Sequence, residues 1–336
     1  SSESVKKMRA SILLIGALLP RFGEAKMSFP GGCVLGKRSV DTHTGAFKAL
    51  GAQIIDATRG LHIKAKKLKG TKFVLSEMSV TATENAIMAA VLAEGETEIR
   101  LAATEPHVQD LCNFLKKMGA TISGIGTTIL TIKGAKSLKG TTYSIIGDYL
   151  EAGTFAIIAA ATKGDVEIEG FEPHDLDIVW QKFKEMGVQF ELGKNSIHVF
   201  PTKKLNSIKV LRTAVYPSFP TDLQAPFTVL LTQAHGVSKV FETLFEGRLN
   251  YLLELEEMGA HTEFLNPHQA LIIGPSKLKS MPISSHDIRA GAAMVVAALI
   301  APGKTEISNI NYIDRGYENF DLKLRALGAD IERAKK

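Results

Sequence analysis

A cysteine lies in the middle of a glycine-rich, cationic stretch, SFPGGCVLGKRSVDTH, at residues 28–43. Two glycines precede Cys33, and the pair Lys37 and Arg38 follows it closely. Positive charge beside a thiol lowers its pKa and raises the fraction of reactive thiolate, and glycines widen the choice of backbone conformations. The pattern predicts a reactive thiol in a cationic loop. The alternative is a small apolar residue without chemical function.

Further charged residues stand where anions are commonly bound. Several lie at or just before the starts of apolar segments that are predicted to be helices, namely Arg9, Asp222, Asp287 and Arg289. Others lie in loops that follow predicted strands, namely Asp41, Arg248, Asp314 and Arg315. Helix N-termini offer free N–H groups and partial positive charge to phosphates and carboxylates. The alternative role of Thr83, Thr221, Asp222 and Asp287 is that of helix N-caps.

Composition excludes several other classes of protein. The chain has 336 residues, a net charge of +5 and two cysteines, which is not a disulfide framework. Cys112 falls on an amphipathic segment, where a buried thiol is expected. The histidines lack metal-ligand spacing, so we expect neither a metal nor a cofactor, and there is no long basic run to bind nucleic acid. The apolar runs at residues 10–20 and 290–303 are shorter than the ~20 residues of a spanning helix.

A repeat of about 70 residues organises these elements. The pattern KALGAQI recurs as KKMGATI, KEMGVQF, EEMGAHT and RALGADI, with glycines at 51, 119, 187, 259 and 328. A second set, at 23, 95, 164, 236 and 303, follows the long apolar segments with the same step. Glycine just past a helix end indicates a left-handed cap, and the β-favouring residues after it predict a strand.

Each repeat therefore predicts a strand, an apolar helix, a strand, a loop, an amphipathic helix and two strands. The apolar helices are expected inside the fold, and the helices with lysine and glutamate on one face outside it. We predict an α/β protein of two domains, at residues 1–146 and 147–336. If the units group by threes, the first domain holds two of its three units, and one more unit precedes residue 1.

The motifs resemble those of the UDP-N-acetylglucosamine 1-carboxyvinyltransferases over nearly the whole chain. The similar segments are MRAS, RFG, PGGCVLGKRSVDTH, SVTATENAIMAA, FPTDLQAPF, FEGR, DIRA and IDRGYE. The resemblance implies an inside-out α/β barrel, with βαβαββ units in two domains that face one another across a cleft. It also implies that the enolpyruvyl group of phosphoenolpyruvate moves to the 3-hydroxyl of UDP-N-acetylglucosamine with release of phosphate, in the bacterial cytoplasm, as an early step of peptidoglycan synthesis.

The same resemblance assigns roles to individual residues. Cys33 matches the loop cysteine that protonates C3 and is alkylated by fosfomycin, and Asp222 matches the carboxylate that takes the hydroxyl proton. Arg38 and Arg315 match positions that hold phosphoenolpyruvate, and Arg315 is counted with the catalytic residues. The remaining matches to substrate-binding positions are Arg9, Ser39, Val40, Asp41, Thr42, Ser79, Val80, Leu244, Arg248, Asp287 and Arg289.

Some positions depart from the family pattern. The Lys-Asn pair near the family's N-terminus has no counterpart, Ser39 replaces a common proline, Glu77 replaces a basic residue of some relatives, and GDYLE replaces PDRIE. We therefore expect the 336-residue chain by itself to be poorly folded or inactive and the natural full-length protein to be active.

Two alternatives remain open at this stage. One is the sister enzyme 5-enolpyruvylshikimate-3-phosphate synthase, which lacks the cysteine loop. The other is a non-catalytic paralogue that binds UDP-sugars, although such a binder has no need of a thiol and a base. A monomer that closes around UDP-N-acetylglucosamine is expected.

Overall fold

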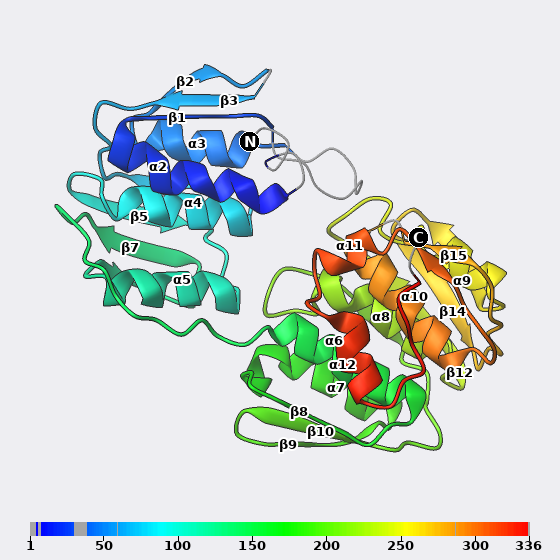
Figure 1. Cartoon of the computed structure of the whole chain (residues 1–336). Helices are drawn as coiled ribbons and strands as arrows, with labels where there is room; N and C mark the ends of the chain where they lie inside the picture. Colours follow the sequence, from blue (N-terminus) through cyan, green and yellow to red (C-terminus); the bar gives the residue numbers. More distant parts are fainter. Residues whose placement is uncertain (1–4, 6–7, 30–38, 59, 286, 335–336) are drawn as a thin grey trace. The chain divides into compact units, whose positions relative to one another are not determined.

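The computed structural model describes residues 5, 8–29, 39–58, 60–285 and 287–334. The described part of the chain divides into two compact α/β units, which meet in sequence between Ile146 and Gly147. Figure 1 shows helices and sheets in both units. Each unit is described by itself.

The first unit contains two sheets and their helices. The sheet β1-β3-β2 is antiparallel, and in the sheet β4-β5-β7-β6 only the pair β4 and β5 is parallel. In chain order the elements are η1 (Arg9–Ile12), α2 (Leu13–Phe22), β1 (Glu24–Met27), α3 (Asp41–Ala49), β2 (Gln53–Asp56), β3 (Leu61–Lys64), β4 (Lys72–Val74), α4 (Val80–Ala90), β5 (Glu96–Arg100), α5 (Pro106–Lys117), β6 (Thr121–Ser123) and β7 (Ile129–Lys133).

The second unit repeats the same pattern around three apolar helices. Its sheets have the orders β8-β10-β9, β11-β12-β14-β13 and β15-β16. In chain order the elements are α6 (Tyr149–Thr162), β8 (Val166–Glu169), η2 (Pro173–Leu176), α7 (Asp177–Met186), β9 (Gln189–Leu192), β10 (Ser196–Phe200), β11 (Val210–Arg212), α8 (Thr221–Leu231), β12 (Gly236–Phe241), α9 (Leu252–Glu257), β13 (His261–Asn266), β14 (Gln269–Gly274), β15 (Ile283–Ser284), α10 (Ile288–Ile300), β16 (Ile307–Ser308), α11 (Asn311–Asp314) and α12 (Phe320–Ala326).

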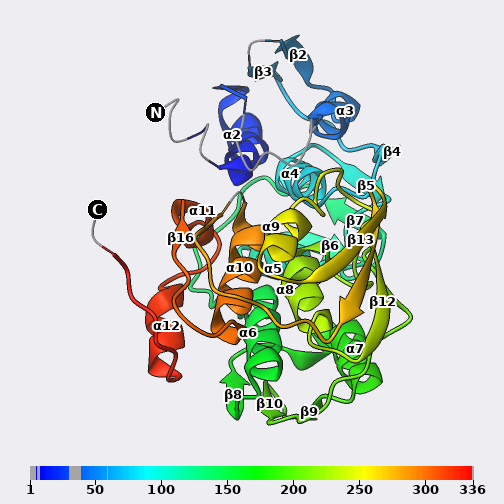
Figure 2. The same cartoon turned by 90° about the vertical axis from the view of Figure 1, so that its right-hand side faces the viewer.

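The apolar helices of the second unit form its core, as their composition predicts. Helices α6, α8 and α10 pack against one another, and the sheets β8-β10-β9 and β11-β12-β14-β13 lie around them (Figure 2). A helix that is apolar on all sides is stable only when it is covered on all sides. The starts of α8 and α10 lie side by side, since Arg289 at the start of α10 donates a hydrogen bond to Asp222 at the start of α8.

The first apolar helix does not follow this prediction. Ile15 and Leu19 of α2 are buried, but Leu14 and Phe22 are 53% and 72% exposed. On its covered side α2 packs tightly on α4. The closeness is seen at Gly16, where a Cβ atom would lie 2.6 Å from the side-chain oxygen of Asn85. Within the described residues, α2 therefore has one buried face, whereas α4 is covered on nearly all sides.

The predicted left-handed glycines are mostly confirmed. All five glycines of the KALGAQI pattern have positive φ, between 80° and 103°. In the second set Gly164 is an exception: Lys163 adopts the left-handed conformation at the end of α6 instead. The strand predicted after Gly328 is also wrong, since residues 329–334 form no strand. Among the described residues no helix is long and apolar enough to span a bilayer.

Candidate functional site

The second unit brings together a carboxylate and two guanidiniums that are far apart in sequence. Nη2 of Arg248 donates to Oδ1 of Asp222 at 2.9 Å, and Nη2 of Arg289 donates to Oδ2 at 3.0 Å. The side chains of Arg248 and Arg289 are only 4% and 17% exposed, whereas that of Asp222 keeps 31% of its surface exposed. The cluster is therefore a charged group with an open side.

Helix starts position this cluster. Asp222 is the second residue of α8, which begins at Thr221 after Pro220 at the N-cap position. Asp287 caps α10 by accepting hydrogen bonds from the backbone N–H groups of Arg289 and Ala290, at 2.7 and 3.0 Å. The role of Asp287 is thus to begin α10 at the residue that places Arg289 beside Asp222. Its predicted contact with substrate stays a prediction.

Electrostatics keep Asp222 ionised. Burial by itself raises the pKa of Asp222, but the guanidiniums of Arg289 and Arg248 outweigh burial and lower that pKa well below its ordinary value. Burial likewise lowers the pKa of Arg289, and Asp222 reverses the effect, so the pKa of Arg289 is raised. The three side chains therefore carry one negative and two positive charges at neutral pH.

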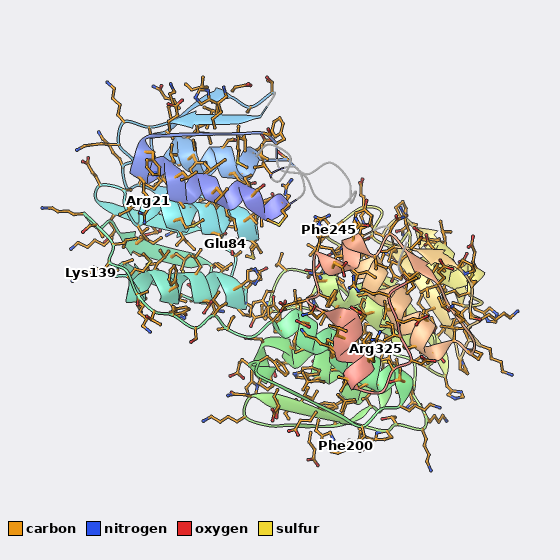
Figure 3. The ribbon with its side chains drawn as sticks, in the orientation of Figure 1. Arg21, Glu84, Lys139, Phe200, Phe245 and Arg325 are labelled. Atoms are coloured by element: carbon orange, nitrogen blue, oxygen red, sulfur yellow. The ribbon has the colours of Figure 1, made fainter. Side chains whose placement is uncertain are left out.

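Arg248 is held from two further directions. Its Nε donates to the hydroxyl of Thr221 at 3.2 Å, and the guanidinium carbon lies 5.2 Å from the centre of the Phe245 ring, a cation–π contact. Figure 3 marks Phe245. Leu244, predicted to bind substrate, lies in the same turn and is 38% exposed.

Arg315 is exposed just after α11. A Cβ at the neighbouring Gly316 would lie 3.3 Å from Nη1 of Arg289, so this turn packs on the start of α10. Within the described residues, Arg315 has neither a hydrogen bond nor an ion pair with Asp222. Arg315 is therefore not part of the Asp222 cluster, and its predicted contact with phosphoenolpyruvate stays a prediction.

In the first unit, the predicted residues 39–42 form a hydrogen-bonded turn at the start of α3. The hydroxyl of Ser39 donates to Oδ2 of Asp41 at 2.5 Å, and its oxygen accepts the Asp41 N–H at 2.9 Å. Nη2 of Arg9 donates to the Ser39 carbonyl at 3.1 Å. Arg9 and this turn are therefore neighbours. Val40 is the residue that precedes the helix.

Thr42 and Ser79, which are also predicted to bind substrate, make hydrogen bonds within the first unit. The Thr42 hydroxyl lies 2.7 Å from that of Ser76 and donates to Oε1 of Glu77 at 3.1 Å. Ser79 caps α4, and Val80 is the first residue of that helix. Glu77, which departs from the family pattern, therefore packs beside two of the predicted sugar-binding segments.

A buried network of neutral groups joins α2, α3 and α4. Nδ2 of Asn85 lies 3.0 Å from Nδ1 of His43 and donates to the Ile12 carbonyl at 3.2 Å, and the Asn85 Oδ1 accepts the N–H of Gly16 at 2.8 Å. Nε2 of His43 lies 3.2 Å from the Thr81 hydroxyl. Burial, and then the charge of Arg9, lowers the pKa of His43 to about 4. His43 is therefore neutral and structural at pH 7.

Glu84 directly precedes Asn85 on α4, and Figure 3 marks it. It is 8% exposed. Burial, and then the negative charge of Glu105, raises the pKa of Glu84 to about 7. The motif SVTATENAIMAA contains Glu84, but its residue types do not indicate that this glutamate is buried.

Cys33 and Arg38 lie outside the described residues, so their predicted roles stay predictions. Cys112 is buried as predicted, at 1% exposure, and burial raises the pKa of its thiol to about 12. In the described part of the chain no three His, Cys, Asp or Glu side chains are grouped to hold a metal ion.

Two threonines do not have the capping role considered for them. Ser79 and Pro220, not Thr83 and Thr221, occupy the N-cap positions of α4 and α8. The Thr83 hydroxyl donates to the Ser79 carbonyl and accepts the Ala103 N–H, at 2.7 and 3.0 Å. The Thr221 hydroxyl donates to Oε2 of Glu242 at 2.8 Å. Sequence reasoning missed Glu242 altogether, because it stands outside every motif.

Comparison with known proteins defines the class. The family profile described as EPSP synthase (3-phosphoshikimate 1-carboxyvinyltransferase) matches residues 1–324. The crystal structure of the enolpyruvyl transferase NikO from Streptomyces tendae covers 99% of this chain and 79% of its own, with a TM-score of 0.87 and 23% identity. EPSP synthase from Acinetobacter baumannii has a TM-score of 0.74 and 21% identity, with 97% of this chain and 78% of that chain covered. The fold is that of the enolpyruvyl transferases, which confirms the predicted fold class.

Curated relatives narrow the class further. A UDP-N-acetylglucosamine 1-carboxyvinyltransferase of Borrelia garinii is 44% identical over 98% of this chain and 78% of its own length. The protein of the same name from Cellvibrio japonicus is 46% identical over 99% of this chain and 79% of its own. The chain belongs to this family of transferases, as its motifs predict.

Proposed function

We propose that this protein transfers the enolpyruvyl group of phosphoenolpyruvate to the 3-hydroxyl of UDP-N-acetylglucosamine and releases phosphate. Two findings support the proposal: relatives that are 44% to 46% identical over nearly the whole chain carry this name, and Asp222 is held between two arginines. The geometry of Asp222 is the observation on which the proposal rests, because the reaction needs a carboxylate beside the 3-hydroxyl of the sugar.

Asp222 is proposed to accept the proton of the sugar hydroxyl. Arg248 and Arg289 occupy one site on each carboxylate oxygen, and the exposed part of the carboxylate leaves acceptor sites free for a hydroxyl donor. Because its pKa is held low, Asp222 is a weak base. The proton therefore moves as the hydroxyl oxygen bonds to C2 of phosphoenolpyruvate, when the hydroxyl becomes more acidic.

The other reacting carbon, C3, gains a proton, and the family resemblance assigns that donor role to Cys33. The resulting tetrahedral intermediate then loses phosphate from C2 and a proton from C3, which restores the double bond and gives the enol ether. Arg38 and Arg315 are proposed to hold the phosphate and carboxylate of phosphoenolpyruvate, since a guanidinium binds such groups with two parallel hydrogen bonds.

The nucleotide sugar is proposed to contact both sets of residues described above. In the first unit these are Arg9, the turn at residues 39–42, Ser79 and Val80. In the second unit they are Leu244, Arg248, Asp287 and Arg289. The protein is proposed to act as a monomer in the cytoplasm, without a metal or other cofactor.

Phosphate release from phosphoenolpyruvate tests the proposal. In the natural protein, release should require UDP-N-acetylglucosamine and should not occur with shikimate 3-phosphate. Fosfomycin should label Cys33, and Cys33→Ser should abolish that labelling. Release with shikimate 3-phosphate would favour the sister enzyme, and binding of UDP-N-acetylglucosamine without any release would favour a non-catalytic paralogue.

A further inference from the structure

Glu242 is a carboxylate with no role in the proposed reaction and no contact with water. It follows β12 directly and is 0% exposed. A buried carboxylate is costly unless hydrogen bonds compensate for the lost water. Its partners therefore indicate why a glutamate stands here.

One carboxylate oxygen of Glu242 fixes the turn that carries Leu244. Oε1 accepts the backbone N–H groups of Leu244 and Phe245, at 2.9 and 3.3 Å. The Glu242 backbone is itself tied to His268, through an N–H to carbonyl bond of 2.8 Å and a contact of 3.0 Å between the Glu242 carbonyl and the His268 Nδ1. The turn is thereby anchored to the hairpin of β13 and β14.

The other oxygen begins a chain of hydrogen bonds that ends at the proposed base. Oε2 of Glu242 accepts the Thr221 hydroxyl at 2.8 Å, Thr221 accepts Nε of Arg248 at 3.2 Å, and Arg248 donates to Asp222 at 2.9 Å. A carboxylate only accepts and a guanidinium only donates. The Thr221 proton must therefore point to Glu242, and its lone pair must face Arg248.

This arrangement gives Arg248 a defined orientation. Two of its three guanidinium nitrogens are engaged by neighbouring residues of α8: Nε by Thr221 and Nη2 by Asp222. Without the hydroxyl, the contacts that the described residues still make with the guanidinium are those of Asp222 and the Phe245 ring. Glu242 fixes the hydroxyl, and the hydroxyl fixes the arginine.

We propose that Glu242 and Thr221 are positioning residues for the transfer reaction, which hold Arg248 on Asp222 and the Leu244 turn in place without touching substrate. The inference rests on the proposed function for its kinetic consequence. Its structural consequence, a fixed pairing of Arg248 with Asp222, is independent of the substrate.

Thr221→Val tests the chain of bonds at its centre, because valine keeps the shape and removes the hydroxyl. A hydrogen bond to a charged group contributes about 1.5 to 3 kcal/mol, so kcat/KM should fall about 10- to 100-fold. The loss should appear mainly in kcat. The acid limb of the pH profile should shift to higher pH. The reason is that Arg248, when it is held less firmly, lowers the pKa of Asp222 by a smaller amount than in the parent. Thr221→Ser should recover most of the activity.

Thr228 offers a matched control on the same helix. Thr228 is buried, at 0% exposure, whereas Thr221 is half-buried. The Thr228 hydroxyl donates to the Gln224 carbonyl at 2.9 Å and accepts Nε2 of Gln224 at 3.1 Å, and among the described residues it has no bond to Arg248. Thr228→Val should lower thermal stability as Thr221→Val does, with no shift of the acid limb. Glu242→Gln is the second test, because glutamine keeps only one acceptor oxygen and cannot serve both the Leu244 turn and the Thr221 hydroxyl, so kcat should fall in the same direction.

A measurement without substrate distinguishes the positioning role of Glu242 and Thr221 from the proposed transfer function. The pKa of the Asp222 carboxyl, followed by carbon-13 NMR, should be higher in Thr221→Val than in the parent and unchanged in Thr228→Val. The inference is overturned if the two valine variants are indistinguishable in this pKa and in kcat/KM. If the parent releases no phosphate but the pKa shift is observed, the proposed function fails and the positioning role stands.

Discussion

Each unit has a polar cluster among its helices, and the two clusters are built on opposite principles. In the second unit Asp222, Arg248 and Arg289 are ionised, and the carboxylate keeps an exposed side. In the first unit Asn85 and His43 are neutral and almost wholly buried. The charged cluster has free acceptor sites for a ligand. In the neutral cluster the hydrogen bonds instead join α2, α3 and α4 to one another. The comparison predicts that one cluster governs reaction rate and the other governs stability.

Asp222→Asn should have the largest effect. General base catalysis contributes about 10²- to 10⁴-fold, so we expect kcat to fall about a thousandfold. Phosphate release measures the rate, and binding of UDP-N-acetylglucosamine by calorimetry checks that the variant is still folded. A turnover within tenfold of the parent would remove Asp222 from the chemistry.

Asn85→Ala should be the most destabilising change in the neutral cluster. It removes three buried hydrogen bonds, to Gly16, Ile12 and His43, and should cost about 4 kcal/mol of unfolding free energy in the first unit. The single tryptophan, Trp180, lies in the second unit, so hydrogen exchange of α4 amides is the suitable probe.

Thr81→Val is the matched control for Asn85→Ala. It removes only the contact with Nε2 of His43, and about 1 kcal/mol is expected. Equal losses in the two variants would mean that Asn85 does not hold the helices together.

Glu84→Gln should change how the stability of the first unit depends on pH. The folded-state pKa of Glu84 is raised to about 7 from 4.5, so the folded state binds the proton more tightly than the unfolded state. Its contribution is present below pH 4.5 and is lost as pH rises through 7, by about 2 to 3 kcal/mol between pH 5 and 8. The variant should abolish this slope. Glu96→Gln, at an exposed position of β5, should retain it.

His43→Gln should abolish a smaller slope of the opposite sign. The folded-state pKa of His43 is lowered to about 4 from 6.5, so the unfolded state binds the proton more tightly. The contribution of His43 to stability should fall by about 2 kcal/mol from pH 7 to pH 5, which opposes the gain from Glu84 over the same range. Exchange of α3 amides in the parent and in His43→Gln measures the difference between the two proteins, and a difference that does not change with pH would contradict a lowered His43 pKa.

The sequence predicted the elements well and the long-range contacts poorly. Left-handed glycines such as Gly119 and Gly187 stop helices for a local steric reason, so their spacing was sufficient to predict helix ends. Lys163 adopted the same conformation without being glycine, which no spacing rule detects.

The residues of the site likewise include some that local motifs predict and others that only packing brings together. Asp222 and Arg248 were found through motifs, but Glu242 was not, because its function depends on a hydroxyl 21 positions away in the chain. The polar contact between Asn85 and His43 likewise joins two helices and has no periodic signal. Such pairs are specified by packing, which brings together residues whose separation in sequence carries no information.

The most direct test of the comparison is to measure the two charge states in one experiment. Carbon-13 NMR of the Asp222 carboxyl and nitrogen-15 NMR of the His43 ring, followed from neutral to acid pH, report both. We predict that Asp222 stays ionised well below the ordinary aspartate pKa of about 3.9, while His43 stays neutral until pH approaches about 4. An Asp222 that takes up its proton at or above the ordinary pKa, or a His43 that is charged near pH 6.5, would contradict the account.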